Sequence, residues 1–300
     1  MKAMNKLLAM FVLFAVAMGA QAADKLKPFY LAYTAQGEVA AVAAQVKGKL
    51  TAAGFEVVGS YSPYDNAMIM VVTNSDLKQA AAKTKFGGFG AIERVTVTKV
   101  GDQVQVAYTN PTYFAAAYRM DGDLASVTAA LEKALGKQEA YGSKEGLSAE
   151  DLRDYHYKFL MPYFDDVIDL ADYKDHATAV AAVEKGLAEK KGGVSKVYQL
   201  DIPGSGETVF GVHMTDDCSG DKYIMSRIDF KKVRSTGHLP YEMVVRGNKV
   251  YTLPAEFRIA ISFPDLSMMG SNSFASIMCA PNAIKTALTK ASGGTESSNW

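Results

Sequence analysis

The stretch that decides the fold is IERVTVTKVGDQVQVAYTNP, residues Ile92–Pro111. Apolar and polar side chains alternate in the middle of Ile92–Val100 and in the first part of Gln103–Thr109, which is the period of a strand with one buried face. The Gly101-Asp102 pair between these two segments is typical of a tight turn. We therefore predict an antiparallel hairpin in the first half of the chain.

Periodicity on either side of this hairpin predicts the rest of a folded unit. Glu38–Ala53 places valine and leucine side chains on one helical face and ends at Gly54, a residue favoured just after a helix C-terminus. Further strands are predicted at Phe29–Thr34, Phe55–Tyr61 and Ala67–Thr73, and a closing helix at Leu124–Leu135. The order β-α-β(4)-α predicts an α+β fold in which an antiparallel sheet carries its helices on one face.

A second copy of this unit is predicted further along the chain. Helical segments beginning at Val42 and Val180 lie 138 residues apart, the turns at Gly101 and Gly247 lie 146 apart, and the last helices lie 157 apart. An offset that only rises is expected of a duplicated domain whose second copy gained loop residues. Chance similarity of two alanine-rich helices would explain the first match alone. The second copy predicts strands at Thr208–His213, Glu242–Arg246, Lys249–Leu253 and Arg258–Phe263, and a last helix at Asn282–Ala291.

The first residues have the pattern of a secretory leader. Lys2 and Lys6 precede the uncharged apolar run Leu7–Ala20, and small residues up to Ala22 favour cleavage before Ala23. The run is shorter than the roughly 20 residues that span a membrane. An uncleaved anchor is the alternative. We expect a cleaved signal peptide, a soluble protein of the periplasm or the exterior, and no membrane attachment after cleavage.

The expected organisation is a signal peptide at 1–22, a first domain at 23–140, a connector at 141–175, a second domain at 176–292 and a flexible tail at 293–300. In the connector, Ser148 and Asp151 have the spacing of a capping box, which marks the start of a helix. Pro162 should end or kink that helix. We therefore predict an ordered, helical connector.

Composition excludes several classes of protein. Lys+Arg and Asp+Glu both number 32, and loss of the leader removes two lysines, so the mature chain has a net charge of about −2. A nucleic-acid binder needs a basic face, so this balance argues against one. Two cysteines exclude a four-cysteine zinc or iron–sulfur site, and 49% hydrophobic residues exclude a disordered chain.

One local motif adds a family resemblance. The strand Val106–Thr109 ends in Asn110-Pro111 and leads to the small residues Ala115–Ala117 and then to Met120. In this motif, the order of elements and the tandem copy, the chain resembles the family known as domain of unknown function 302 (DUF302). The resemblance implies a β-α-β(4)-α fold in single or tandem form and no settled activity. The second copy departs from the motif, because Ser262–Pro264 lacks the asparagine.

The most reactive cluster of side chains runs from His213 to Cys218. Imidazole, thioether and thiol groups suit a soft metal, so His213, Met214, Cys218 and Cys279 are candidate ligands, with copper as the metal. The alternative is a Cys218–Cys279 disulfide, as expected in an oxidising compartment. It would close a loop of about 60 residues and contribute about 3–4 kcal/mol. Two structural free thiols are the third possibility.

A second candidate site surrounds Asn110-Pro111. An asparagine before proline is kept out of the helical region, and its side chain can cap the turn or helix that follows. Tyr108, Tyr113 and Tyr118 flank this turn. On one interpretation the five residues line the mouth of a ligand pocket between sheet and helix. On the other, the turn is structural only.

Two further segments suggest weaker hypotheses. Phe86–Gly90 is rich in glycine but precedes a strand, whereas phosphate loops follow one, so we predict a mobile connection. Lys231–Arg234 with His238 forms a small basic patch. It would either hold an anion or be a solvated face.

The sequence contains no GxSxG, HExxH or paired-glycine motif of the known catalytic and dinucleotide-binding types. The leading hypothesis is therefore an exported protein, either monomeric or homo-oligomeric, that binds a small molecule or a periplasmic protein in a cleft where the two sheets meet. It predicts no catalysis and no cofactor. The alternatives are a periplasmic metal-handling or redox accessory protein and an enzyme with a site near Asn110.

Overall fold

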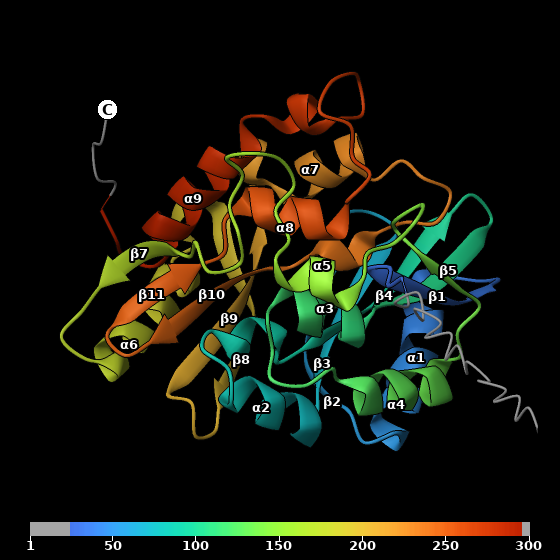
Figure 1. Ribbon diagram of the computed structural model, residues 1–300, viewed down its shortest axis with the longest axis horizontal. Coiled ribbons are helices and arrows are strands. Elements are labelled where there is room, and N and C mark those ends of the chain that lie inside the picture. The colour runs from blue at the N-terminus through green and yellow to red at the C-terminus, as the bar shows by residue number, and fades with distance from the viewer. Residues whose placement is uncertain (1–24, 296–300) are drawn as a thin grey trace, which may run out of the picture.

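The computed structural model describes residues 25–295 as a mixed α+β protein with two antiparallel sheets (Figure 1). The first sheet has the strand order β2-β3-β4-β5-β1-β6 and the second β7-β11-β10-β9-β8. Counted from β2 and from β8, five strands follow the same order in both sheets. The predicted α+β class is confirmed. The predicted signal peptide at 1–22 and residues 296–300 of the predicted tail lie outside the described residues.

The first sheet and its helices contain every element predicted for the first unit. The strands are β1 (Phe29–Ala35), β2 (Glu56–Tyr61), β3 (Ala67–Thr73), β4 (Glu93–Val100), β5 (Gln103–Thr109) and β6 (Glu139–Tyr141). The helices are α1 (Val39–Ala52), α2 (Ser75–Ala82), α3 (Pro111–Ala117) and α4 (Ala125–Leu135), with a 3-10 turn η1 (Gly87–Gly90). The sequence did not predict α2 and α3, because a helix of two turns is too short to show a clear period.

The second sheet and its helices are built from the rest of the chain. The strands are β7 (Ile168–Asp172), β8 (Val194–Ile202), β9 (Glu207–Met214), β10 (Tyr241–Arg246) and β11 (Lys249–Thr252). The helices are α6 (His176–Ala188), α7 (Asp221–Ile228), α8 (Ala255–Ser262) and α9 (Ala280–Ala291), with 3-10 turns η2 (Lys191–Gly193), η3 (Asp217–Ser219), η4 (Thr236–His238) and η5 (Phe274–Ile277). The prediction of a strand at Arg258–Phe263 is wrong, since these residues lie in and just after α8. Every residue from 257 to 263 is buried, and an apolar run without a period does not distinguish a buried strand from a buried helix.

The segment expected to be a helical connector, 141–175, contains one short helix, α5 (Ala149–Arg153). The predicted capping box is confirmed: the Ser148 hydroxyl accepts from the Asp151 N–H at 3.1 Å, and the Asp151 carboxylate accepts from the Ser148 N–H at 3.3 Å. Pro162 lies in the irregular chain that follows. The segment then enters β7, which pairs with β11, so the second sheet begins before residue 176.

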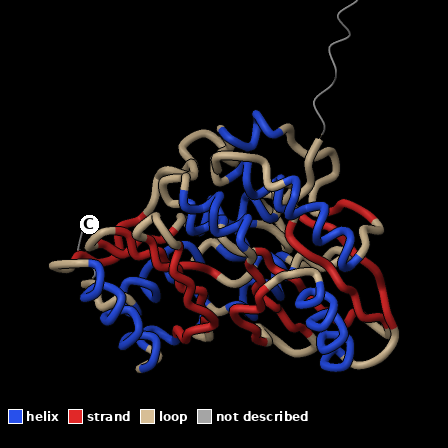
Figure 2. The backbone as a smooth tube through the Cα atoms, turned by 90° about the horizontal axis from the view of Figure 1, so that it is seen from below, coloured by secondary structure: helices blue, strands red, loops and turns tan. Residues whose placement is uncertain are grey.

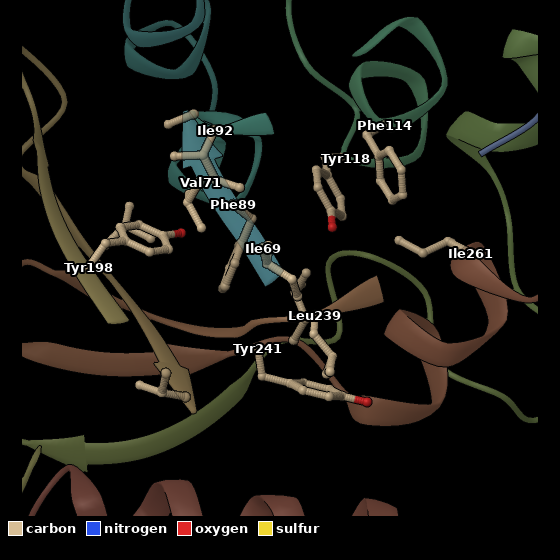
Figure 3. Packing of buried hydrophobic residues seen from close by; sticks show 14 of the residues in the cluster. Ile69, Val71, Phe89, Ile92, Phe114, Tyr118, Tyr198, Leu239, Tyr241 and Ile261 are labelled. Carbon is tan, nitrogen blue, oxygen red and sulfur yellow. The ribbon is translucent and has the colours of Figure 1, made fainter. Parts of the chain in front are cut away.

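Each sheet has one face covered by a pair of helices. Helices α1 and α4 pack on the first sheet, and α6 and α9 pack on the second (Figure 2). Figure 3 shows that the space between the sheets is filled from both halves, with Ile69 and Val71 of β3 and Phe89 of η1 near Tyr198 of β8 and Tyr241 of β10. Among residues 25–295, no helix is long and apolar enough to cross a membrane.

The 3-10 turns fasten the two halves to each other. Turn η1 packs on β9 and β10, and η4 packs on β3, β4 and β5. The Glu207 carboxylate of β9 accepts hydrogen bonds from the backbone N–H groups of Phe86 and Gly88, both at 2.9 Å. A Cβ atom at Gly88 would lie 2.7 Å from a methyl carbon of Val209, so glycine is required for this approach. The prediction of a mobile connection at Phe86–Gly90 is wrong, because the segment is buried between the halves.

A buried charge network crosses the same interface. The Arg94 guanidinium of β4 donates to the Glu242 carboxylate of β10, and Arg258 Nη2 of α8 lies 3.6 Å from that carboxylate. Arg258 Nη2 also donates to the backbone carbonyls of His238 and Pro240 at 2.7 and 3.1 Å. All three charged side chains are about 1% exposed. The two halves are thus joined by ionic contacts that water does not reach.

Candidate functional site

A cleft of about 450 Å³ lies between the two halves, beside α7, and we name it the α7 cleft. One wall comes from the first half: the β2–β3 turn at 64–66 and the end of β4 at 98–99. The other comes from the second half: Lys222, Met225 and Ser226 of α7, then Asp229, Phe230 and Arg234 after it. The volume lies within the range of small-molecule sites, roughly 300–1,000 Å³.

The loop that leaves α7 crosses onto the first sheet and closes the cleft. Gln105 of β5 holds this loop with its whole amide group: Nε2 donates to the carbonyl of Lys232 at 2.8 Å, and Oε1 accepts from the N–H of Arg234 at 3.0 Å. An amide that uses both its donor and its acceptor on one loop fixes the position of that loop. The cleft wall is therefore ordered by a side chain of the opposite half.

Hydroxyl groups of the first half hold the far end of the same loop. Thr236 Oγ1 lies 3.0 Å from Tyr64 Oη and 2.9 Å from Thr98 Oγ1. Burial raises the pKa of Tyr64, so its phenol stays protonated at neutral pH. Because both Tyr64 and Thr98 line the α7 cleft, the cleft offers neutral hydroxyl groups as well as charges.

Asp229 is the residue of the cleft whose bonding is incomplete. Its Oδ1 accepts from the Ser235 N–H at 2.9 Å, while Oδ2 is buried and has no hydrogen-bond partner among the described protein atoms. Burial raises the pKa of Asp229 to about 7, against the opposing effects of the Ser235 N–H, Arg234 and Lys231. Asp229 and Phe230 also line a neighbouring hollow of about 120 Å³. A buried carboxyl with a free oxygen and a pKa near neutrality is a candidate ligand-binding group.

The charges around the cleft are unevenly paired. Lys222 lies 3.1 Å from Asp65, and Lys99 lies 3.0 Å from a glutamate that is 78% exposed. The Lys222–Asp65 pair is itself largely exposed, so both contacts are weak. Arg234 Nη1 donates to the backbone carbonyl of Asp229, and no carboxylate of residues 25–295 lies within 4 Å of its guanidinium. The lining therefore suits a polar, charged molecule.

The structure places the predicted Asn110 site inside the fold. Asn110 is fully buried and caps α3: its side-chain oxygen accepts from the Tyr113 N–H at 3.4 Å, and its amide donates to the carbonyl of Lys27 at 2.8 Å. Pro111 is the first residue of that helix. The predicted capping role is confirmed, and these groups are already bonded within the protein.

The three tyrosines of that site are buried and bonded as well. Tyr108 donates to the carbonyl of Gly136 at 3.1 Å, Tyr113 donates to the carbonyl of Ile261 at 2.9 Å, and Tyr118 accepts from Arg258. Each is 1% exposed or less. The structure brings Tyr113 and Tyr118 together with the interface between the halves, and none of the five predicted residues lines the α7 cleft.

The predicted metal ligands are divided between different contacts. Cys218 and Cys279 form a disulfide with their Cα atoms 5.8 Å apart, so the prediction of this disulfide is confirmed and that of free thiols is wrong. Met214 is buried in the core, and the His213 ring lies against Tyr61. Within the part of the chain that the structure describes, no group of three or more His, Cys, Asp or Glu side chains is placed to hold a metal. The copper alternative stays a prediction.

The basic segment Lys231–Arg234 belongs to the loop that leaves α7, and its side chains line two different hollows. Arg234 lines the α7 cleft, and Lys231 lines the neighbouring hollow, 3.6 Å from Asp265. His238 is not part of this surface, because it is buried with Nε2 2.9 Å from Tyr241 Oη. Burial and the nearby arginines hold the pKa of His238 well below its usual range, so it is neutral. Of the predicted patch, Arg234 is the residue that reaches the cleft.

Sequence reasoning missed Asp229 and Tyr64. Asp229 sits between Ile228 and Phe230 at the end of an unpredicted helix, where a single acid has no motif to mark it. Tyr64 lies in a hairpin turn more than 150 residues away. The useful signal was the KKVR segment at 231–234, which is the one stretch of this wall that the sequence singled out.

Comparison with known proteins gives no relative. A scan against protein-family models, a search of curated proteins and a search of solved structures all find no match for this chain.

Proposed function

We propose that this chain is a non-catalytic binding protein that holds a small polar molecule in the α7 cleft. The observation that carries the proposal is the buried Oδ2 of Asp229, which has no hydrogen-bond partner among the described protein atoms, in a cleft of about 450 Å³. Leaving a buried polar atom unpaired costs about 1–3 kcal/mol. A ligand whose entry gives this oxygen a hydrogen-bond partner recovers that energy, which favours the bound state.

An exported location and a duplicated architecture belong to the same proposal. The leader-like sequence at 1–22 and the Cys218–Cys279 disulfide support export, because disulfides persist in oxidising compartments. The equal order of five strands in each sheet supports duplication of one unit, and it is what a tandem DUF302-like protein would have. A cleft between two copies of a unit gives a ligand contacts with both.

A second hollow occupies the matching place on the other sheet, and it differs in its lining. About 440 Å³ in volume, it lies beside α2 and the β8–β9 turn and is lined by Ser75, Lys78, Gln79, Ala82, Lys83 and Pro203. It has no carboxylate and no tyrosine. Asp229, Tyr64 and Arg234 therefore distinguish the α7 cleft, and we propose one ligand site rather than two.

The test is to fill each hollow with the same side chain. Ser226 of α7 and Gln79 of α2 are exposed and line the two hollows, so Ser226→Trp and Gln79→Trp are matched variants. Protein exported and purified gently is examined by native mass spectrometry for a bound small molecule. We expect a bound mass in the wild type and in Gln79→Trp and its loss in Ser226→Trp. An equal bound mass in all three, or none in the wild type after exposure to a periplasmic extract, contradicts the proposal.

A further inference from the structure

We propose that the ligand of the α7 cleft is a small anion with a carboxylate, phosphate or sulfate group, and that it binds together with one proton, which Asp229 carries. This inference rests on the proposed function of the cleft and names the chemistry of its ligand. Three cationic side chains, those of Lys99, Lys222 and Arg234, line the cleft, and Asp229 belongs to the same lining.

The cations of the cleft are available to a ligand. Lys99 and Lys222 come from opposite walls, and their acid partners are exposed, so these lysines can turn to an anion at little cost. Arg234 uses Nη1 on a backbone carbonyl and has no carboxylate within 4 Å among residues 25–295. The remaining N–H groups of a guanidinium match the paired oxygens of a carboxylate or phosphate. An anion here would contact both halves of the protein.

The Asp229 carboxyl would oppose such an anion if it were ionised. Its Oδ1 is already held by the Ser235 N–H, so Oδ2 is the atom that can take a proton. When protonated, Oδ2–H becomes a hydrogen-bond donor and the local negative charge disappears. The oxygen that would otherwise be a buried, unpaired anion thus carries a proton instead, and the cations of the lining face no negative charge from Asp229.

The other charged and titratable groups around Asp229 agree with an anion. Those facing it from the surrounding elements are Arg234 and Lys231 of its own loop, Tyr64 and Asp65 of the β2–β3 turn, Lys99 of β4, Tyr141 of β6, Lys222 of α7 and Asp265 after α8. The two acids of this set, Asp65 and Asp265, each lie beside a lysine, and the tyrosines are neutral. Without Asp229, the surroundings carry four positive charges and two negative ones.

Binding therefore consumes one proton when Asp229 starts ionised: the carboxylate, the anion and a proton combine, and no other bond changes. With the pKa of Asp229 at about 7, affinity is constant well below that pH and falls about tenfold for each pH unit above it. A cationic ligand would require the ionised carboxylate, and its affinity would rise over the same range. The sign of the pH dependence thus decides between the two classes of ligand.

The experiment measures binding of sodium sulfate, whose charge is constant over the range, and of putrescine, a dication, by isothermal titration calorimetry at about pH 6 and about pH 9. We expect the full chain to bind sulfate with an affinity about 100-fold weaker at the higher pH, and we expect no binding of putrescine. Asp229→Asn supplies an amide donor in place of the acid, so it should bind sulfate equally at both pH values. Arg234→Met should weaken sulfate binding at both.

Lys249→Met removes a lysine of β11 that does not line the cleft, and it should bind sulfate as the wild type does. Absence of sulfate binding at about pH 6, sulfate affinity in the wild type that does not fall with pH, or binding of putrescine would each overturn the inference. A ligand mass that is lost in Ser226→Trp but belongs to a cation would overturn it while leaving the proposed function intact.

Discussion

Replacing Glu242 by alanine removes the carboxyl group that lies between two buried guanidinium groups. Arg94 donates to it, Arg258 lies 3.6 Å from it, and each of the three is about 1% exposed. Glu93 of β4, which precedes Arg94 in the chain, does not replace the Glu242 carboxylate. Burial raises the pKa of Glu93 to about 8, so it is mostly protonated at neutral pH. Glu242→Ala therefore leaves two unpaired positive charges between the sheets.

The expected loss is large against the stability of a domain. Breaking a buried ion pair by removing one partner costs about 3–5 kcal/mol, and the total free energy of unfolding of a domain is about 5–15 kcal/mol. With a urea m-value of about 3 kcal/mol per molar, the unfolding midpoint falls by about 1 M or more. Urea unfolding followed by far-ultraviolet circular dichroism measures this shift.

A surface control sets the scale. Glu132 of α4 lies 3.2 Å from Lys137 with both side chains partly exposed, so Glu132→Ala should cost less than about 1 kcal/mol. If Glu242→Ala lowers the free energy of unfolding by no more than this control does, the conclusion that the buried charge network stabilises the interface between the halves is refuted. If Glu242→Ala does not fold, urea unfolding of the triple variant Arg94→Met, Glu242→Leu, Arg258→Met tests the same conclusion. It should unfold at a higher urea concentration than Glu242→Ala, since no buried charge is left unpaired.

Three further outcomes are expected. Replacing both cysteines by serine should lower the free energy of unfolding by about 3–4 kcal/mol, measured in urea, and a change below about 1 kcal/mol would contradict the role given to the disulfide. Gly59→Ala places a Cβ atom 2.6 Å from the carbonyl oxygen of Val197, so it should lower the thermal midpoint, whereas Gly48→Ala, with nothing within 4 Å, should not. Glu93→Gln should leave stability below about pH 4.5 unchanged and raise it progressively toward pH 8. Between these pH values the folded wild type keeps a proton on Glu93 that the unfolded chain has lost, so the wild type loses about 1.4 kcal/mol of stability per pH unit and the variant does not. Equal pH profiles of the two proteins would refute this.

The sequence predicts those parts of the fold that local pattern determines. The hairpin at Ile92–Pro111 needs only alternation and a turn signal, and the Asn110 cap needs only a polar side chain three residues before a backbone N–H. Helix α8 escapes the same reasoning because both its faces are buried, which removes the period. Local sequence patterns do not predict an element whose burial depends on residues that are distant in the chain.

The site shows this limit more strongly than the fold. The walls of the α7 cleft come from the segments 64–66, 98–99 and 222–234, which no local pattern relates to one another. The sequence did single out 231–234 as basic, and Arg234 of that segment does line the cleft. It offered no reason to select Asp229, because the pKa and the free oxygen of this residue follow from burial by the other half.

The polar side of β4 explains why the cleft lies where it does. Alternation in this strand predicts one buried face and one solvated face, yet Arg94, Thr96 and Thr98 are 1%, 2% and 5% exposed. The second half covers this face, and Glu242 of β10 supplies the charge that Arg94 needs. Thr98, the last of the three, bonds Thr236 and lines the α7 cleft. The cleft is thus the end of the polar interface that reaches solvent, so a ligand bound there contacts both halves and should hold them together.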